Sequence, residues 1–249
     1  RGPGTRMLIE DDLRSLGTIS GGCLEGDLHE NASEVFTEGT PRLLHYDATS
    51  EDDILWGTGL GCNGTIDILL EKLPRAENYH YPDLLYDSAL GNQRGVLISV
   101  FKVAGETTAA PGQHLVLDEK GNATDDIADR QLREVALAAA RTSLAELDHT
   151  HLPVVPGQTQ HCEWAQCQAS LLIEPLLPPI TFYIFGAGYD ALPLAHFAAE
   201  LGWRVTVSDH RPSYADYERF PQAQRVLLAQ PGHLPADLSF DSRSAAVII

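Results

Sequence analysis

The sequence predicts an α/β protein with an N-terminal duplicated α/β domain over residues 1–177 and a partial Rossmann-like parallel sheet over residues 180–249. Three observations support this fold class. Strand-like apolar runs and helix-like segments follow one another along the chain. The blocks 1–74 and 94–177 share one layout, and a glycine-rich turn follows an apolar run near residue 185. A hydrophobic content of 43% in 249 residues is enough for a sizeable core.

The two blocks of the first domain align by pattern. Gly2–Asp11 corresponds to Ala110–Glu119, and the blocks close on the apolar strands Ile66–Glu71 and Ala169–Glu174. Between these strands each block has an acidic helical segment, Gly26–Glu38 in the first and Ala128–Glu146 in the second. The shared order predicts an internal duplication. The alternative is that two strand–turn–helix–strand units resemble each other by chance.

The ends of the sequence differ from what this layout requires. The second block is preceded by a clear strand, Gly95–Val103, whereas the sequence starts at the turn of the first block. The final residues, Ala245–Ile249, have the apolar character of a buried parallel strand. We therefore expect that the sequence lacks one strand at its N-terminus and that the Rossmann-like domain is truncated.

A dinucleotide-binding pattern opens the second domain. Gly186, Gly188 and Ala191 form G-x-G-x-x-A between a strand and a helix, and Asp209 ends the next strand. The first glycine permits a tight turn, and the second lets the backbone approach a pyrophosphate. Asp209 is expected to accept from ribose hydroxyls and to favour an NAD-type dinucleotide, although Arg211 leaves a phosphorylated ligand open. A turn used only as scaffold is the alternative.

Two cysteines lie in glycine-rich loops. Cys23 follows the pair Gly21–Gly22 just before a helix, and Cys62 lies between Gly61 and Gly64. Loops of this composition let backbone amides face a ligand, and a cysteine near a helix N-terminus is typical of reactive thiols. We therefore expect both sulfurs to face one cavity. The alternative is that both cysteines are small buried hydrophobic residues.

The remaining cysteines do not predict a metal site. Cys162 and Cys167 lack the C-x2-C spacing of zinc ligands, and their roles stay open. The nearby His149, His151 and His161 are expected to be loop residues in solvent.

The charge and cysteine content exclude several classes of partner. A formal net charge of −18 argues against nucleic-acid and anionic membrane-surface binding. No stretch approaches the roughly 20 apolar residues of a membrane span, and no signal-peptide apolar region is present. Four scattered cysteines do not form a disulfide framework, so a cytoplasmic protein is expected.

The sequence resembles the XdhC/CoxI family in three runs: GTISGGCLEGDLHENASEVFTEGTPRLLHYD, GLGCNGTIDILLEKL and FYIFGAGYDALPLAHFAAELGWRVTVSDHRP. This family contains accessory proteins of xanthine dehydrogenase and related molybdenum hydroxylases. The resemblance implies a chaperone that binds the molybdenum cofactor, as molybdopterin or its dinucleotide form. It would hold the cofactor while a cysteine desulfurase supplies the sulfido ligand, and would deliver it to the hydroxylase apoenzyme. A homodimer is expected.

The resemblance also implies roles for residues. Cys23 and Cys62 become the thiols that face molybdenum or handle sulfur, and Glu25 of the same motif is grouped with them. The residues expected to bind the cofactor or a dinucleotide are Gly21, Gly22, Gly61, Gly64, Gly186, Gly188 and Asp209. Two other functions stay open: an NAD(P)-dependent oxidoreductase that uses the Rossmann-like domain, and a thiol sulfur-transfer protein that acts without molybdenum.

Overall fold

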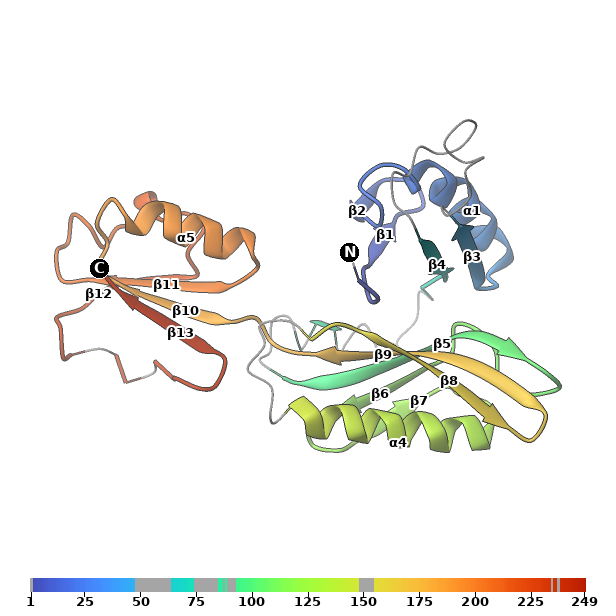
Figure 1. Cartoon of the computed structure of the whole chain (residues 1–249). Coiled ribbons are helices and arrows are strands. Elements are labelled where there is room, and N and C mark those ends of the chain that lie inside the picture. The colour runs from blue at the N-terminus through green and yellow to red at the C-terminus, as the bar shows by residue number, and fades with distance from the viewer. Residues whose placement is uncertain are drawn as a thin grey trace. The chain divides into compact units, whose positions relative to one another are not determined.

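The computed structural model describes residues 2–47, 64–73, 85–86, 88, 93–147, 155–233, 235–236 and 238–249. The chain forms two units (Figure 1). The N-terminal unit comprises Arg1–Asp87, Gln93–Asp148 and Val155–Leu176, and the C-terminal unit comprises Ser88–Asn92, His149–Val154 and Leu177–Ile249. The main division between Leu176 and Leu177 is close to the boundary predicted from the sequence.

The first block of the N-terminal unit consists of a hairpin, a helix and a second hairpin. Its elements are β1 (Met7–Ile9), β2 (Ser15–Gly17), α1 (Glu25–Glu38), β3 (Arg42–Asp47) and β4 (Thr65–Leu70). Within the described residues, β1 pairs only with β2 and β3 only with β4, both antiparallel. Buried side chains on one face of α1 pack toward β4, so this block has a small core built around Leu24, Leu28 and Ile68.

The second block is a curved antiparallel sheet with one long helix against it (Figure 1). Its elements are β5 (Gly95–Ala104), β6 (His114–Asp118), β7 (Ala123–Asp125), α4 (Arg130–Leu147), β8 (Gln158–Trp164) and β9 (Cys167–Leu176). The strand order is β7-β6-β5-β9-β8. The central strand β5 is mostly apolar and buried along its first six residues, and its alternate side chains pack into separate apolar clusters on the two faces of the sheet.

Both blocks have the same order of elements, and each contains more strands than the sequence predicted. The helix of each block lies between two hairpins, whereas the sequence predicted single strands on either side. Strands such as β8 lacked a signal because β8 has mostly exposed polar side chains and no continuous apolar run. The common origin of the two blocks stays a prediction.

The two blocks contact each other through an ion pair and a histidine–glutamate contact that are arranged in the same way. Arg6 Nη2 lies 2.7 Å from Glu174 Oε2, and His114 Nε2 lies 2.7 Å from Glu71 Oε2. In the predicted alignment Arg6 corresponds to His114 and Glu71 to Glu174. Each block therefore directs a basic side chain at the closing glutamate of the other. Burial raises the pKa of the Glu174 carboxyl, and Arg6 opposes that shift.

The C-terminal unit is a parallel sheet, which confirms the predicted Rossmann-like fold class. Its elements are β10 (Thr181–Phe185), α5 (Ala191–Glu200), β11 (Arg204–Asp209), the 3-10 turn η1 (Tyr217–Arg219), β12 (Arg225–Leu228) and β13 (Ser244–Ile248). The strand order is β12-β11-β10-β13, and all pairs are parallel. Short alanine side chains on α5 are buried against the sheet, which lets the helix approach β10 and β11 closely.

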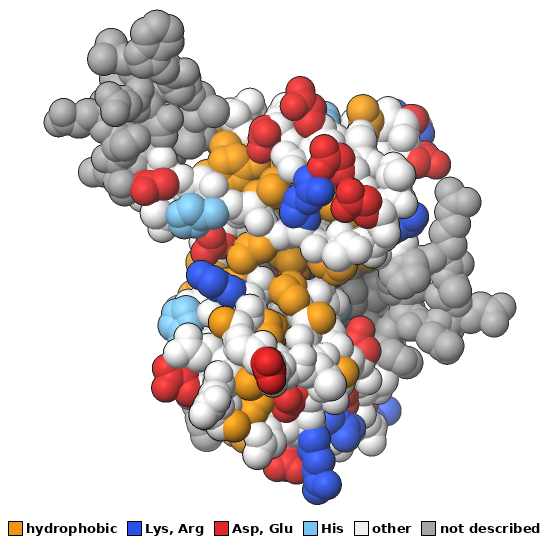
Figure 2. Space-filling view, turned by 90° about the vertical axis from the view of Figure 1, so that its right-hand side faces the viewer, with side chains coloured by type: hydrophobic (Ala, Val, Ile, Leu, Met, Phe, Trp, Pro, Cys, Tyr) orange, Lys and Arg blue, Asp and Glu red, His pale blue; other side chains and the backbone are white. Residues whose placement is uncertain are grey.

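One face of the molecule carries both charged and hydrophobic side chains. Figure 2 shows one face on which acidic and basic side chains are interspersed, while hydrophobic side chains gather across its middle. None of the helices in the described part of the chain is long and apolar enough to span a membrane.

Candidate functional site

The loop before α1 is organised around one carboxylate. Glu25 is the first residue of α1, and its side chain turns back onto the preceding loop. The hydroxyls of Thr18 and Ser20 donate to it, the former at 2.6 Å. It also accepts from the backbone N–H groups of Ile19, Ser20, Gly21, Gly22 and Leu24, at distances between 2.8 and 3.3 Å. Donors from six residues of the loop therefore converge on one side chain.

These donors keep Glu25 ionised. The Ser20 and Thr18 hydroxyls, joined by backbone N–H groups, hold the pKa of the carboxyl well below its usual range. A carboxylate so fully bonded is a poor proton carrier at neutral pH, so the chemistry it supports is positional. The sequence predicted loop amides that face a ligand, whereas five of them face Glu25. A motif cannot reveal this difference, because it does not specify the direction of the glutamate side chain.

Backbone conformation explains the two glycines of this loop. Gly21 and Gly22 have φ angles of 83° and 121°, a region that side chains with a Cβ rarely adopt. This conformation aims both N–H groups at the Glu25 carboxylate. The glycines are thus needed for the shape of the loop itself.

Cys23 is presented to solvent by this rigid loop. The residue is exposed and its thiol is free. The neighbouring Leu24 is fully buried, and its backbone N–H donates to Ser20 Oγ at 2.8 Å. Anchors lie on both sides of the cysteine because the Gly22 N–H is also bonded to Glu25 at 2.8 Å. The arrangement suits a thiol that must meet a partner at a defined position.

The predicted proximity of the Cys62 loop to the Cys23 loop is not tested by the described residues. Cys62 and Gly61 lie outside the described residues, and Gly64 is the residue immediately before β4. A cavity shared by Cys23 and Cys62 therefore stays a prediction.

The other two cysteines are structural. Cys162 and Cys167 are buried in the β8–β9 hairpin, and Cys167 Sγ donates to the Glu106 carbonyl at 3.2 Å. Burial raises the pKa of the Cys162 thiol, which keeps it protonated and unreactive. The nearby His161 was predicted to lie in a loop, but it lies in strand β8 and is bonded to Ser170 Oγ at 2.8 Å. Across the described residues, no group of three or more His, Cys, Asp or Glu side chains could hold a metal ion.

The glycine-rich turn in the C-terminal unit has the tight geometry that its sequence predicts. Gly186 has φ of 114°, and a Cβ there would collide with the Ile249 carbonyl. A Cβ on Gly188 would lie 2.6 Å from Asp190 Oδ1. Ala187 and Ala191 are fully buried, so the turn and the start of α5 pack directly on the sheet. Gly186 is therefore required by a close backbone approach and Ala187 and Ala191 by tight packing, whereas at Gly188 only the movable Asp190 side chain would have to shift.

Asp209 lies at the tip of β11, as predicted, and is bonded to groups of the protein itself. It ends β11 and is 4% exposed, yet its carboxylate is occupied by protein donors. Oδ1 accepts from the backbone N–H and Nε of Arg211, and Oδ2 accepts from Arg211 Nη2 and the Ala187 N–H, all at 2.8 or 2.9 Å. The Arg211 hydrogen bonds are the main cause of a strongly lowered Asp209 pKa. The sequence predicted that this carboxylate accepts from ribose hydroxyls, which would have to compete with these four donors.

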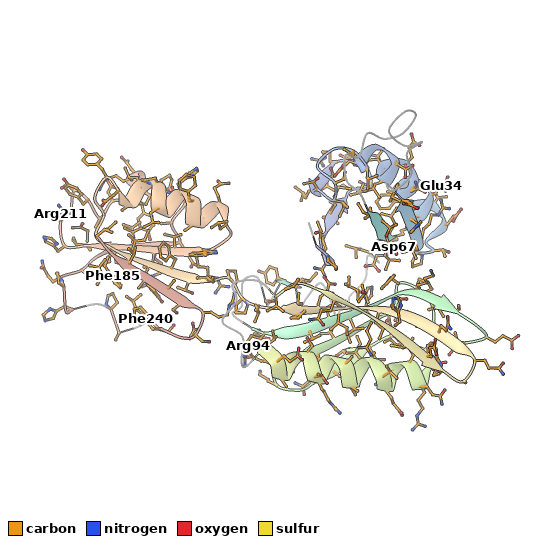
Figure 3. All side chains as sticks on the ribbon, in the orientation of Figure 1. Glu34, Asp67, Arg94, Phe185, Arg211 and Phe240 are labelled. Atoms are coloured by element: carbon orange, nitrogen blue, oxygen red, sulfur yellow. The ribbon has the colours of Figure 1, made fainter. Side chains whose placement is uncertain are left out.

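Two further residues near this turn, Tyr214 and Arg219, were not predicted from the sequence, whereas Arg211, whose guanidinium packs on the Tyr214 ring, was. The Arg211 guanidinium lies 3.8 Å from the centre of the Tyr214 ring, and that of Arg219 lies 4.8 Å from the same centre. Figure 3 shows Arg211 at the end of the C-terminal unit where β10 and β11 finish. The only local signal was the spacing of aromatic and basic residues after Asp209, which is common in surface loops.

Comparisons with known proteins match both candidate regions. The model of the XdhC and CoxI family matches residues 1–47, and that of the XdhC Rossmann domain matches residues 182–249. A protein from Bacillus subtilis, described as a probable subunit of xanthine dehydrogenase, is 29% identical over 248 residues, which is 100% of this chain and 67% of that protein. A crystal structure of a xanthine dehydrogenase from Bacillus halodurans has a TM-score of 0.71 at 25% identity. That match covers 97% of this chain and 63% of the other, so the chain spans less than two thirds of that structure's length.

Proposed function

The chain belongs to the XdhC/CoxI family, and from this premise we propose that it serves the maturation of a xanthine dehydrogenase-type molybdenum hydroxylase. In this role it holds the molybdenum cofactor for sulfuration and delivers it to the apoenzyme. The observation that carries the proposal is the exposed Cys23 thiol on a loop fixed by Glu25. The names of the relatives, which mention xanthine dehydrogenase, support the choice of partner.

The residues of the loop fit one end of such a cofactor. A thiolate is a soft donor of the kind that suits a sulfur-rich metal centre, and Cys23 is accessible. The cofactor would supply the molybdenum centre that the hydroxylase uses. The phosphate end does not fit this loop, because the N–H groups that could bind it already donate to Glu25. We therefore assign the metal end of the cofactor to Cys23 and leave its phosphates to other donors.

Glu25 acts in this proposal as a positioning residue. Its carboxylate supplies the negative charge that the loop amides would otherwise seek in a ligand, which keeps the loop in one conformation. A loop that is already ordered costs no further conformational entropy when the cofactor or a partner protein binds. The Cys23 thiol is therefore in position both to accept the molybdenum cofactor and to release it to the apoenzyme.

The partners follow from the role. A cysteine desulfurase is the proposed sulfur donor, the hydroxylase apoenzyme is the recipient, and a homodimer is the proposed assembly. Cys62 is the proposed second thiol of the site. Its contribution needs its own test, because it lies outside the described residues.

The test is activation of the partner hydroxylase by the full chain carrying Cys23→Ser. The two proteins are produced together with the desulfurase under anaerobic conditions, and hydroxylase turnover and sulfido content are measured. We expect activation to fall about tenfold or more, as when a group that holds a metal is altered, with an unchanged melting temperature. Cys167→Ser is the matched control, because a serine hydroxyl can keep the donation to Glu106. Equal activation by both variants would contradict the proposal.

The two other functions are separated by what co-purifies with the protein. Mass spectrometry of the anaerobically isolated chain should detect a pterin species if the proposal holds. A nicotinamide dinucleotide without pterin would favour an oxidoreductase. A protein persulfide on Cys23 without pterin would favour sulfur transfer that is independent of molybdenum.

A further inference from the structure

The carboxyl end of the parallel sheet holds a cationic cluster formed by Arg211, which is bonded to Asp209, and Arg219, with both guanidinium groups close to the Tyr214 ring. In sheets of this topology a nucleotide lies outside the carboxyl ends of the strands, and the residue at the tip of the second strand faces its ribose. Here that residue is Asp209, at the end of β11. What surrounds Asp209 therefore determines which ribose the site accepts.

Asp209 cannot select an unmodified ribose. An ionised carboxylate offers about four lone-pair sites, and protein N–H groups fill four of them. Ribose hydroxyls would have to displace the side chain of Arg211 or the Ala187 N–H. The Arg211 guanidinium also neutralises the charge with which a bare carboxylate repels a ribose phosphate.

Arg211 is held so that one side remains accessible. Its Nε and Nη2 are used on Asp209, its side chain is 45% exposed, and no described residue is a hydrogen-bond partner of Nη1. Stacking on Tyr214 at 3.8 Å fixes the plane of the guanidinium. A planar, ordered guanidinium with a free edge is the group best suited to bind a phosphate.

Arg219 adds a second cation close to the same turn. Its Nη1 donates to the carbonyls of Ala187 and Tyr214, at 2.7 and 3.0 Å, so it is tied to the glycine-rich turn itself. No described residue accepts a hydrogen bond from its Nη2. Two ordered arginines at one sheet end stand out in a chain of net charge −18, where anions are otherwise repelled.

From these contacts we infer that the glycine-rich turn binds an adenine dinucleotide with a phosphate monoester on its ribose, of the NADP type, in preference to an NAD-type dinucleotide with a free ribose diol. Arg211 binds the ribose phosphate, Arg219 reinforces it, and Asp209 positions Arg211. This inference does not depend on the proposed function, because dinucleotide binding can be measured on the chain without any molybdenum cofactor.

The test is equilibrium binding of NADPH and NADH to the full chain by isothermal titration calorimetry at fixed ionic strength. We expect NADPH to bind at least about tenfold more tightly, in the range of a charge-assisted contact. Inorganic phosphate is the competitor that separates nucleotide from phosphate recognition. It should displace NADPH only at far higher concentration than adenosine 2′-phosphate does.

Variants assign the preference to residues. Arg211→Gln should bring the ratio of the two dissociation constants close to one, and Arg219→Gln should reduce it about threefold or more. In Arg219→Gln the buried Asp209 carboxylate keeps its bonds to Arg211. This variant therefore tests the inference even if Arg211→Gln fails to fold. Arg225→Gln, at the amino end of β12, is the matched control and should leave the ratio unchanged. Equal affinities for both dinucleotides, a preference for NADH, or binding of neither would overturn the inference.

Discussion

The two blocks of the N-terminal unit have the same order of elements but very different cores. In the second block, β5 lies between β6 and β9 and joins both hairpins into one sheet, beneath which α4 buries a large apolar cluster. In the described part of the first block the hairpins β1–β2 and β3–β4 remain separate, and only Leu24, Leu28 and Ile68 form the buried cluster. The second block therefore has a large buried core, whereas the stability of the first block depends on the few contacts of a small one.

The start of the helix also differs between the two blocks. In the second block, Asp129 caps α4 by accepting from the N–H groups of Gln131 and Leu132, and its other oxygen accepts from the Thr107 hydroxyl and Trp164 Nε1. In the first block, Glu25 accepts from the loop that precedes α1. One layout thus carries two local designs, and the design that orders a loop is the one that presents an exposed cysteine. The two blocks thus differ in which N–H groups the carboxylate at the start of the helix accepts from, although their order of elements is the same.

The largest effect is expected from truncating the small core of the first block. Leu28→Ala should lower the free energy of unfolding by about 3 kcal/mol, since Leu28 is fully buried. Hydrogen–deuterium exchange should lose protection in α1, β3 and β4 while β5 and β9 stay protected. Leu132→Ala, at a fully buried site on α4, should have a similar cost but expose the second block. Uniform loss of protection in both variants would show that the blocks unfold as one.

A smaller effect is expected from the carboxylate of the loop. Glu25→Gln should cost about 2 kcal/mol at pH 7, because it removes a charged acceptor that has several donors. The pKa of Glu25 is lowered by folding, so its contribution is complete above about pH 4.5 and is lost as the pH falls below that value. Denaturant unfolding of both proteins should converge on acidification. Asp129→Asn should cost about 1 kcal/mol, since asparagine keeps the helix cap but loses the oxygen that accepts from Thr107 and Trp164. A cost for Glu25→Gln no larger than this would remove the distinction between the two designs.

The smallest effect concerns the contact between the blocks. Gly112 has φ of 83°, and a Cβ there would lie 2.5 Å from Pro41 Cγ of the first block. Gly121 has φ of 85° but open space around it, so it is a matched control for the cost of the backbone conformation. Gly112→Ala should exceed Gly121→Ala by about 1 kcal/mol in thermal unfolding. Equal costs would mean that the blocks are not packed tightly at this point.

Local patterns in the sequence were sufficient for much of the fold. The turn at Gly186, the helix that follows it and the strand that ends at Asp209 all lie where they were predicted. Their signals come from neighbouring residues: apolar periodicity, small residues at close approaches and glycine at a positive φ. The same reasoning placed Cys23 just before a helix, whereas its exposure to solvent was seen only in the structure.

The tertiary structure decided which groups are left for a ligand. Asp209 and Glu25 were both predicted to belong to sites, but their carboxylates are bound by Arg211 and by the loop amides. The central place of β5 and the contact of Arg6 with Glu174 likewise join residues far apart in the chain. A sequence determines which side chains carry charge and where the backbone can turn. Because hydrogen bonds are short and directional, only the folded chain determines which donors reach a given carboxylate.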